Sequence, residues 1–227
     1  MTEADPHLPR RKAVLAAALA LAPAQGWTQA MMEEAGRMAE EGEAEMALLF
    51  PDGLAGLLGV YSDSLDEVMV AGLRAAPLES LKIRARIKLG IQTRIEAVMP
   101  DLEAGRRAAA LLTLPPFMPL AARLAYRTAD ALWREVGDRS TDFNFYTKRA
   151  LALGVYLSTL VFWFRDRSPD HEASWRFLDQ RISDVMVIEG AKVQLRKFAA
   201  YLPSPWAVLG ALRYPDPPAG PSNPDRT

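Results

Sequence analysis

The sequence of 227 residues contains no cysteine, which excludes disulfides, thiolate metal sites and cysteine nucleophiles. Neither of its two histidines, His7 and His171, has a pair of carboxylates at metal-ligand spacing. Ser168 stands where a Glu-x-x-His motif would need its glutamate. The sequence also lacks a phosphate-binding loop, a G-x-S-x-G motif and a G-x-G-x-x-G motif. It therefore predicts neither an enzyme nor a bound metal or cofactor.

Net charge is almost absent as well, with a formal value of −1 at pH 7. We expect no global attraction to nucleic acid or anionic lipid, so any such attraction must be local. Hydrophobic residues make up 50% and charged residues 24%, which fits one large domain with a sizeable core, or one domain with a small satellite. No uncharged run reaches the ~18 residues that a membrane-spanning helix needs.

Most of the sequence has apolar residues at the spacing typical of an α-helix. Residues 81–89 alternate with period two, but isoleucine continues at every fourth position beyond them, which favours a helix over a strand. Ser168, Pro169 and Asp170 are typical of a helix start, with a hydroxyl cap and an acid near the positive end of the dipole. The patterns predict an all-α protein of about ten helices, over residues 8–22, 27–36, 43–50, 53–75, 78–98, 101–113, 119–136, 141–165, 169–198 and 204–213.

The N-terminal third has a three-helix rhythm, and it starts with a basic triplet. Residues 10–12 precede the run AVLAAALALAPAQG, which has the basic start and small residues of a secretory signal, but its alanine content favours a helix ended by Pro23 and Gly26. The rhythm is similar to that of helix-turn-helix repressors of the TetR type. Residues 33–45, however, hold six glutamates against one arginine, which would place carboxylates against phosphates. We expect no DNA-binding surface there; a repressor contacting DNA only through Arg10–Lys12 is the alternative.

Residues 150–164 carry no charge and span about 22 Å as a helix, which is too short to cross a membrane comfortably. Because the run is apolar on all sides, it predicts the central buried helix of the bundle. Two interpretations of its side chains are open: ordinary core packing, or the lining of an apolar cavity.

The segment 190–214 contains four cations and no acid, interleaved with aromatic and aliphatic residues. Such a composition suits a membrane interface, and packing on the same or a neighbouring subunit is the alternative. The proline-rich tail after it predicts disorder. The candidate membrane-binding residues are Lys197, Phe198, Tyr201, Leu202, Trp206, Leu209, Leu212 and Arg213.

Three motifs carry a family resemblance: RTADALWREVGD at 127–138, STDFNFYTKRA at 140–150 and SPDHEASWRFLDQRI at 168–182. Together with Gly26-Trp27 and the FPDG of residues 50–53, they resemble the accessory lipid-binding proteins of ubiquinone (coenzyme Q) biosynthesis, the "Coq nine" family. The resemblance covers roughly residues 8–190 and argues against a secretory signal.

The resemblance implies a TetR-like helical bundle that has lost DNA binding, forms a homodimer and encloses a cavity for an isoprenoid lipid or quinone intermediate. It implies docking on a membrane surface through a C-terminal amphipathic helix. It also implies a protein partner, the di-iron demethoxyubiquinone hydroxylase, to which the lipid is presented. The family's partner-binding patch matches Leu132, Asp142, Phe145, Tyr146 and Arg149, although the family commonly has tryptophan at the position of Phe145.

These expectations divide the chain into a helix-turn-helix-like part (1–50), a lipid-binding and dimerisation core (51–190), a membrane-associating segment (191–214) and a tail (215–227). The expected location is cytoplasmic, on the inner face of a bacterial plasma membrane, or on the mitochondrial inner membrane in a eukaryote. A TetR-type ligand-responsive transcription regulator is the alternative function. The predicted lining of the cavity comprises Leu153, Tyr156, Leu157, Leu160, Phe164, Trp175 and Met186.

Overall fold

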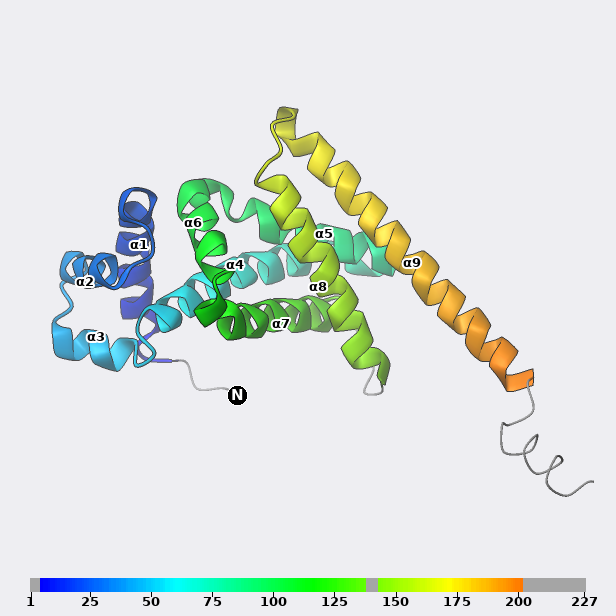
Figure 1. The fold of residues 1–227 in the computed structure, drawn as a ribbon, viewed down its shortest axis with the longest axis horizontal. Coiled ribbons are helices and arrows are strands. Elements are labelled where there is room, and N and C mark those ends of the chain that lie inside the picture. Colours follow the sequence, from blue (N-terminus) through cyan, green and yellow to red (C-terminus); the bar gives the residue numbers. More distant parts are fainter. Residues whose placement is uncertain (1–4, 138–142, 202–227) are drawn as a thin grey trace, which may run out of the picture. The chain divides into compact units, whose positions relative to one another are not determined.

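The computed structural model describes the backbone of residues 5–137 and 143–201, and the side chains of residues 5–137 and 147–186. Every regular element in these ranges is helical, so the all-α prediction is confirmed (Figure 1). The predicted helix 204–213 lies outside the described residues. The α-helices are α1 (Leu8–Gln25), α2 (Gln29–Met38), α3 (Glu43–Leu49), α4 (Leu54–Ala75), α5 (Ile83–Glu96), α6 (Leu102–Leu112), α7 (Met118–Glu135), α8 (Phe143–Trp163) and α9 (Glu172–Tyr201).

Three predicted boundaries are wrong by several residues. Helix α1 continues through Pro23 and ends at Gly26, whose φ of 72° suits glycine. Helix α5 begins at Ile83 rather than 78, because Lys82 is extended and residues 78–80 form a separate 3₁₀ turn. Helix α9 begins at Glu172 rather than 169, after a turn in which Asp170 has a φ of 49°.

The start of α9 is held by Asp166 together with the predicted hydroxyl cap, Ser168. The carboxylate of Asp166 accepts hydrogen bonds from the Ser168 amide (2.8 Å), the Ser174 amide (2.8 Å) and the Ser174 hydroxyl (2.6 Å). The Ser168 hydroxyl accepts from the amide of Ala173 at 3.0 Å. Partial burial alone would raise the pKa of Asp166, but these hydrogen bonds hold that pKa well below its usual range.

Helices α1, α2 and α3 form the N-terminal part, in which α1 packs against α2, α4 and α6 (Figure 1). The cations of the basic triplet are all paired with carboxylates. Arg10 Nε donates to Glu41 at 2.8 Å, on the acidic segment 33–45. Arg11 contacts Asp5 at 2.9 Å and Lys12 contacts Glu67 at 2.6 Å.

Helices α4, α5 and α7 pack on one another and form a core. Gly90 permits their close approach, since a Cβ atom there would lie 2.3 Å from Cδ1 of Leu132 and 3.2 Å from Cδ1 of Leu73. Ile91 and Ile95 beside it are fully buried, as the four-residue isoleucine period predicts.

Helix α8 packs against α5 and α7, and the ring of its Phe162 stacks on Phe177 of α9. Thr159 and Trp163 are buried, whereas Val161 is 57% exposed and Phe162 is 38% exposed. The prediction that residues 150–164 are buried on all sides is therefore wrong for the described chain. A run without charges does not identify which of its faces meets another helix.

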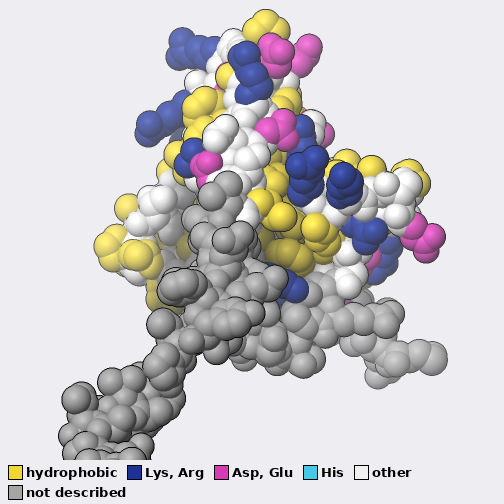
Figure 2. Space-filling view, turned by 90° about the vertical axis from the view of Figure 1, so that its right-hand side faces the viewer, with side chains coloured by type: hydrophobic (Ala, Val, Ile, Leu, Met, Phe, Trp, Pro, Cys, Tyr) yellow, Lys and Arg dark blue, Asp and Glu magenta, His cyan; other side chains and the backbone are white. Residues whose placement is uncertain are grey.

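The chain divides into two compact units, Met1–Ile182 and Ser183–Thr227, and α9 spans the division. On the face drawn in Figure 2, exposed hydrophobic side chains lie beside Lys and Arg side chains. No single helix within the described ranges has the length and apolarity to span a bilayer, but two sharply bent helix pairs meet those criteria: Glu43–Leu49 with Leu54–Ala75, and Ile83–Leu112 with Pro115–Glu135.

Candidate functional site: an apolar cavity with a polar end

A cavity of about 550 Å³ lies among α4, α6, α7 and α8, with one residue, Arg94, contributed by α5. Its volume is within the ~300–1,000 Å³ range of small-molecule sites. Leucines and alanines make up about half of its wall, including Leu58, Leu65, Leu124 and Leu160. Such a wall can hold apolar ligand surface but offers few groups for chemistry.

One end of the cavity is buried and polar. Tyr61, Ser62, Arg94, Thr128 and Tyr156 line it, and each is less than 9% exposed. They come from four helices, α4, α5, α7 and α8, so this end forms only when the helices have packed. It is the place in the cavity where a ligand can meet hydrogen-bonding groups shielded from water.

A buried ion pair organises this end. Arg94 Nε donates to Asp66 Oδ1 at 2.6 Å, and both residues are less than 10% exposed. The Thr128 hydroxyl donates to the same carboxylate at 2.9 Å, and Arg94 Nη2 donates to the Ser62 hydroxyl at 3.2 Å. The guanidinium also lies 5.6 Å from the centre of the Tyr156 ring, within cation–π range. A buried charge is tolerated here because it is paired and hydrogen-bonded.

Tyr61 is held against the same end from the side of the N-terminal part. Its ring stacks on Trp27 with centroids 5.5 Å apart, and Trp27 Nε1 donates to the Ala104 carbonyl at 2.9 Å. The Tyr61 hydroxyl is buried and has no hydrogen-bond partner among the described residues. Burial raises the pKa of Tyr61, so the hydroxyl stays protonated at any physiological pH.

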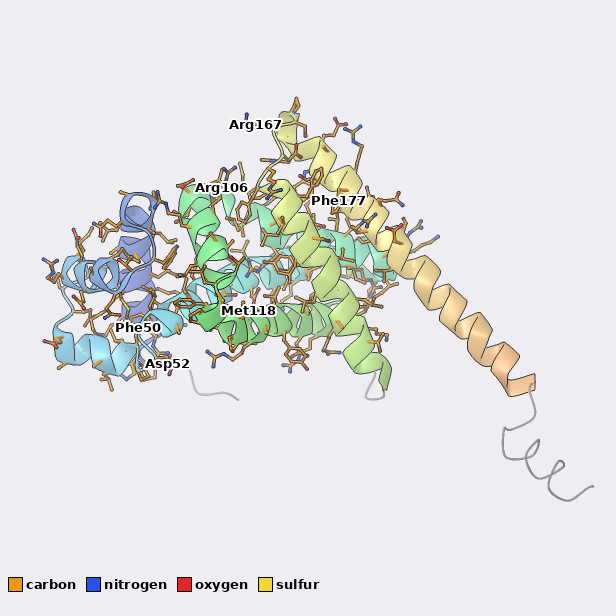
Figure 3. The ribbon with its side chains drawn as sticks, in the orientation of Figure 1. Phe50, Asp52, Arg106, Met118, Arg167 and Phe177 are labelled. Atoms are coloured by element: carbon orange, nitrogen blue, oxygen red, sulfur yellow. The ribbon has the colours of Figure 1, made fainter. Side chains whose placement is uncertain are left out.

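The opposite end of the cavity opens to solvent along α6 and α8. Leu157 and Val161 of α8 are 42% and 57% exposed there. Arg106 of α6 donates from Nη2 to the Phe164 carbonyl at 2.7 Å and so joins the two helices at this rim. Figure 3 labels Arg106 on α6 and Met118 at the start of α7, where α6 has ended. The rim thus combines exposed apolar side chains with arginine.

The structure brings four of the seven predicted lining residues to the cavity: Tyr156, Leu157, Leu160 and Phe164. Leu153 lies one turn away, against a separate small void beside Ile91 and Leu132. Trp175 instead donates from Nε1 to the Asp170 carbonyl at 3.1 Å within the turn before α9. Met186 is 48% exposed and lies in the second unit. Neither Trp175 nor Met186 is part of the wall.

The predicted partner patch is only partly visible. Asp142 and the side chains of Phe145 and Tyr146 lie outside the described residues. Leu132 and Arg149 are 2% and 3% exposed, so in this conformation they are buried and do not form a surface. Arg149 Nε donates to Asp130 of α7 at 2.8 Å.

The motif 127–138 explains how α7 holds the start of α8. Trp133 Nε1 donates to the Lys148 carbonyl at 3.0 Å, and the Lys148 ammonium lies 5.6 Å from the centre of the Trp133 ring. Asp130 accepts from Arg149, and Glu135 accepts from Arg74 of α4 at 2.9 Å. Trp133, Asp130 and Glu135 of this motif therefore hold neighbouring helices together.

Of the predicted membrane-binding residues, Lys197, Phe198 and Tyr201 belong to α9, but their side chains lie outside the description. The other five lie beyond the described backbone. Across the residues whose side chains are described, no group of three His, Asp or Glu is placed to hold a metal ion.

Of the polar end, sequence reasoning found Tyr156 and missed Tyr61, Ser62, Arg94 and Thr128. It also missed Asp66, the partner of Arg94. The one available signal was Arg94 itself, which stands between Ile91 and Ile95 in the apolar stripe of its helix. A cation in such a stripe indicates a buried partner, but nothing in the sequence pairs it with Asp66 on another helix.

A family model and several known proteins are similar to this chain in sequence. The family model described as COQ9 matches residues 118–189. The rat "Ubiquinone biosynthesis protein COQ9, mitochondrial" is 33% identical over 179 residues, covering 76% of this chain and 57% of the rat protein. The human protein of the same name is 32% identical over 190 residues, covering 81% and 59%. The COQ9-B protein of Xenopus laevis is 30% identical over 203 residues, covering 85% and 67%.

A solved structure has a similar fold. The crystal structure of a TetR transcriptional regulator from Nitrosomonas europaea superposes with a TM-score of 0.62 at 20% identity, covering 77% of this chain and 97% of the regulator. The fold is therefore TetR-like, as predicted. The chain spans less than two thirds of the length of the rat and human relatives. From its sequence similarity over most of its own length, the chain belongs to the COQ9 family.

Proposed function

We propose that this chain is a non-catalytic accessory protein of ubiquinone biosynthesis that binds an isoprenoid quinone intermediate in the cavity between α4, α6, α7 and α8. The observation that carries the proposal is the apolar cavity of about 550 Å³. The rat and human relatives, which are named as ubiquinone biosynthesis proteins, suggest the pathway.

A carrier is physically needed because polyisoprenoid tails are very poorly soluble. Exposing each CH₂ group to water costs ~0.8 kcal/mol. The leucine and alanine wall replaces water along such a tail, and the open rim between α6 and α8 provides a path for entry. The exposed apolar side chains and arginine at that rim suit contact with a membrane surface.

The test is to purify the protein without harsh detergent, extract it with organic solvent and identify the lipids by mass spectrometry. Isoprenoid quinones or their precursors, present in proportion to protein, are the expected result. A matched variant, Ala125→Phe, places a large ring on the buried wall of α7 and should lower the recovered lipid. An extract with only bulk phospholipid in both proteins would contradict the proposal.

We further propose two surfaces for delivery. The segment 191–214 docks on the membrane, and the patch at the start of α8 binds the demethoxyubiquinone hydroxylase. Truncation after residue 190 should abolish flotation with anionic vesicles, and Tyr146→Ala should abolish capture of the hydroxylase without lowering the melting temperature. Retained flotation or retained capture would each remove the corresponding surface from the proposal. Homodimerisation and the location at the bacterial plasma membrane or mitochondrial inner membrane stay predictions.

The transcription regulator alternative has the TetR-like fold in its favour, but a fold shared at 20% identity says nothing of DNA binding. Arg10, Arg11 and Lys12, on which DNA contact would depend, all pair with carboxylates. Binding to duplex DNA with a steep dependence on salt concentration would favour the regulator.

A further inference from the structure

The polar end of the cavity holds more hydrogen-bond donors than its protein partners use. Arg94 donates from Nε to Asp66 and from Nη2 to Ser62, at 2.6 Å and 3.2 Å, while its Nη1 has no partner among the described residues. Tyr61 lines the same end, and its buried hydroxyl also has no partner in the described part of the chain. A buried donor without a partner, such as the Tyr61 hydroxyl, is rare, because it costs about 1–3 kcal/mol.

The charge at this end is balanced. The guanidinium of Arg94 is matched by the Asp66 carboxylate, and the Thr128 hydroxyl donates to that carboxylate as well. The other arginines that line the cavity, Arg106 and Arg165, are exposed and lie at the rim. An anionic head group is therefore not favoured at the buried end, whereas a neutral oxygen acceptor is.

The surroundings of the two donors suit a flat ring. Tyr156 places its aromatic face beneath the Arg94 guanidinium, and the Tyr61 ring lies on the wall of α4. From this end the leucine wall continues to Leu157 and Val161 at the open rim. A molecule with an oxygen-bearing ring at one end and an apolar tail at the other matches this order of surfaces.

We propose that Arg94 and Tyr61 form a head-group subsite that binds a neutral carbonyl, methoxy or phenol oxygen on the ring of the ligand, with the tail directed toward the rim. This proposal rests on the proposed lipid-binding function and adds the orientation of the ligand to it. Release of the ring then requires the whole tail to leave first, or the helices around Arg94 to separate.

The experiment compares two probes with the same tail, a decyl-tailed dimethoxybenzoquinone and decylbenzene, by displacement of diphenylhexatriene from the full chain. Because only the quinone can accept hydrogen bonds from the charged Arg94, the wild-type protein should bind it at least about tenfold more tightly than decylbenzene. Arg94→Lys keeps the charge beside Asp66 but removes the guanidinium fork, and should reduce the ratio severalfold. Tyr61→Phe should reduce it less. Arg127→Lys, at an exposed arginine of α7 outside the cavity lining, is the control and should leave the ratio unchanged.

Each outcome decides something different. Equal binding of both probes by the wild-type protein overturns the subsite and leaves lipid binding intact. A preference for the quinone that survives both Arg94→Lys and Tyr61→Phe also overturns it, since the cluster is then structural only. Failure of both probes to displace the dye contradicts the proposed function itself. If Arg94→Lys does not fold, the wild-type ratio and Tyr61→Phe decide, because removing an unpaired hydroxyl leaves the packing in place.

Discussion

The buried pair of Asp66 and Arg94 should be among the most costly polar interactions to break in this chain. The variant Asp66→Asn removes the negative charge but keeps the side-chain shape, so it leaves the Arg94 guanidinium buried without a counterion. Removing one partner of a buried ion pair costs about 3–5 kcal/mol. For a domain of this size each kcal/mol lowers the melting temperature by about 2–4 °C, which gives a loss of about 6–20 °C.

A matched control is available on the same helix. Asp63 of α4 pairs with Arg127 of α7 at 2.7 Å, but the two side chains are 39% and 52% exposed. Exposed pairs contribute about 0–1 kcal/mol, so Asp63→Asn should lower the melting temperature by no more than about 4 °C. Thermal unfolding followed by circular dichroism measures both variants under the same conditions.

A second control separates the charge from the packing. The double variant Asp66→Leu with Arg94→Met replaces both partners by apolar side chains, and buried pairs replaced in this way regain most of the lost stability. The reasoning is refuted if Asp66→Asn and Asp63→Asn shift the melting temperature equally. It is also refuted if the double variant is less stable than Asp66→Asn alone.

Two further predictions concern other elements. Gly90→Ala places a Cβ atom 2.3 Å from Leu132, so it should destabilise the chain by about 1–3 kcal/mol in urea unfolding, whereas Ala at Gly154, which has nothing within 4 Å, should not. The folded chain lowers the pKa of Asp166, so that carboxylate contributes stability above the ordinary Asp pKa of about 3.9, and the contribution is lost as pH falls below it. Asp166→Asn should therefore flatten the fall in unfolding free energy at acid pH, and an unchanged pH profile would contradict the hydrogen-bond assignment.

The course of the helices could be predicted because the relevant signals are local. The isoleucine period of α5 and the proline breaks around 114–119 each act within a few residues. Boundaries were predicted less well where a rule admits exceptions. Pro23 lies in the last turn of α1, where the helix loses one amide donor and still reaches Gly26.

The candidate site was predicted in part for the same reason. Tyr156, Leu157, Leu160 and Phe164 lie in the uncharged run of residues 150–164, so a local pattern identified them. The polar end depends on α4, α5 and α7 meeting, and residues as far apart as Asp66 and Thr128 show no pattern that links them. Trp175 was also predicted to line the cavity, but its indole nitrogen donates to the nearby Asp170 carbonyl instead.

Helix α7 contacts both the polar end of the cavity and the start of α8. Thr128 holds the Asp66 carboxylate at the polar end of the cavity, and five residues later, about 7.5 Å along the axis, Trp133 holds the backbone at Lys148. The same helix therefore holds the counterion of Arg94 inside the cavity and the backbone at the start of α8. A protein bound at the start of α8 would lie one helix away from the head-group subsite.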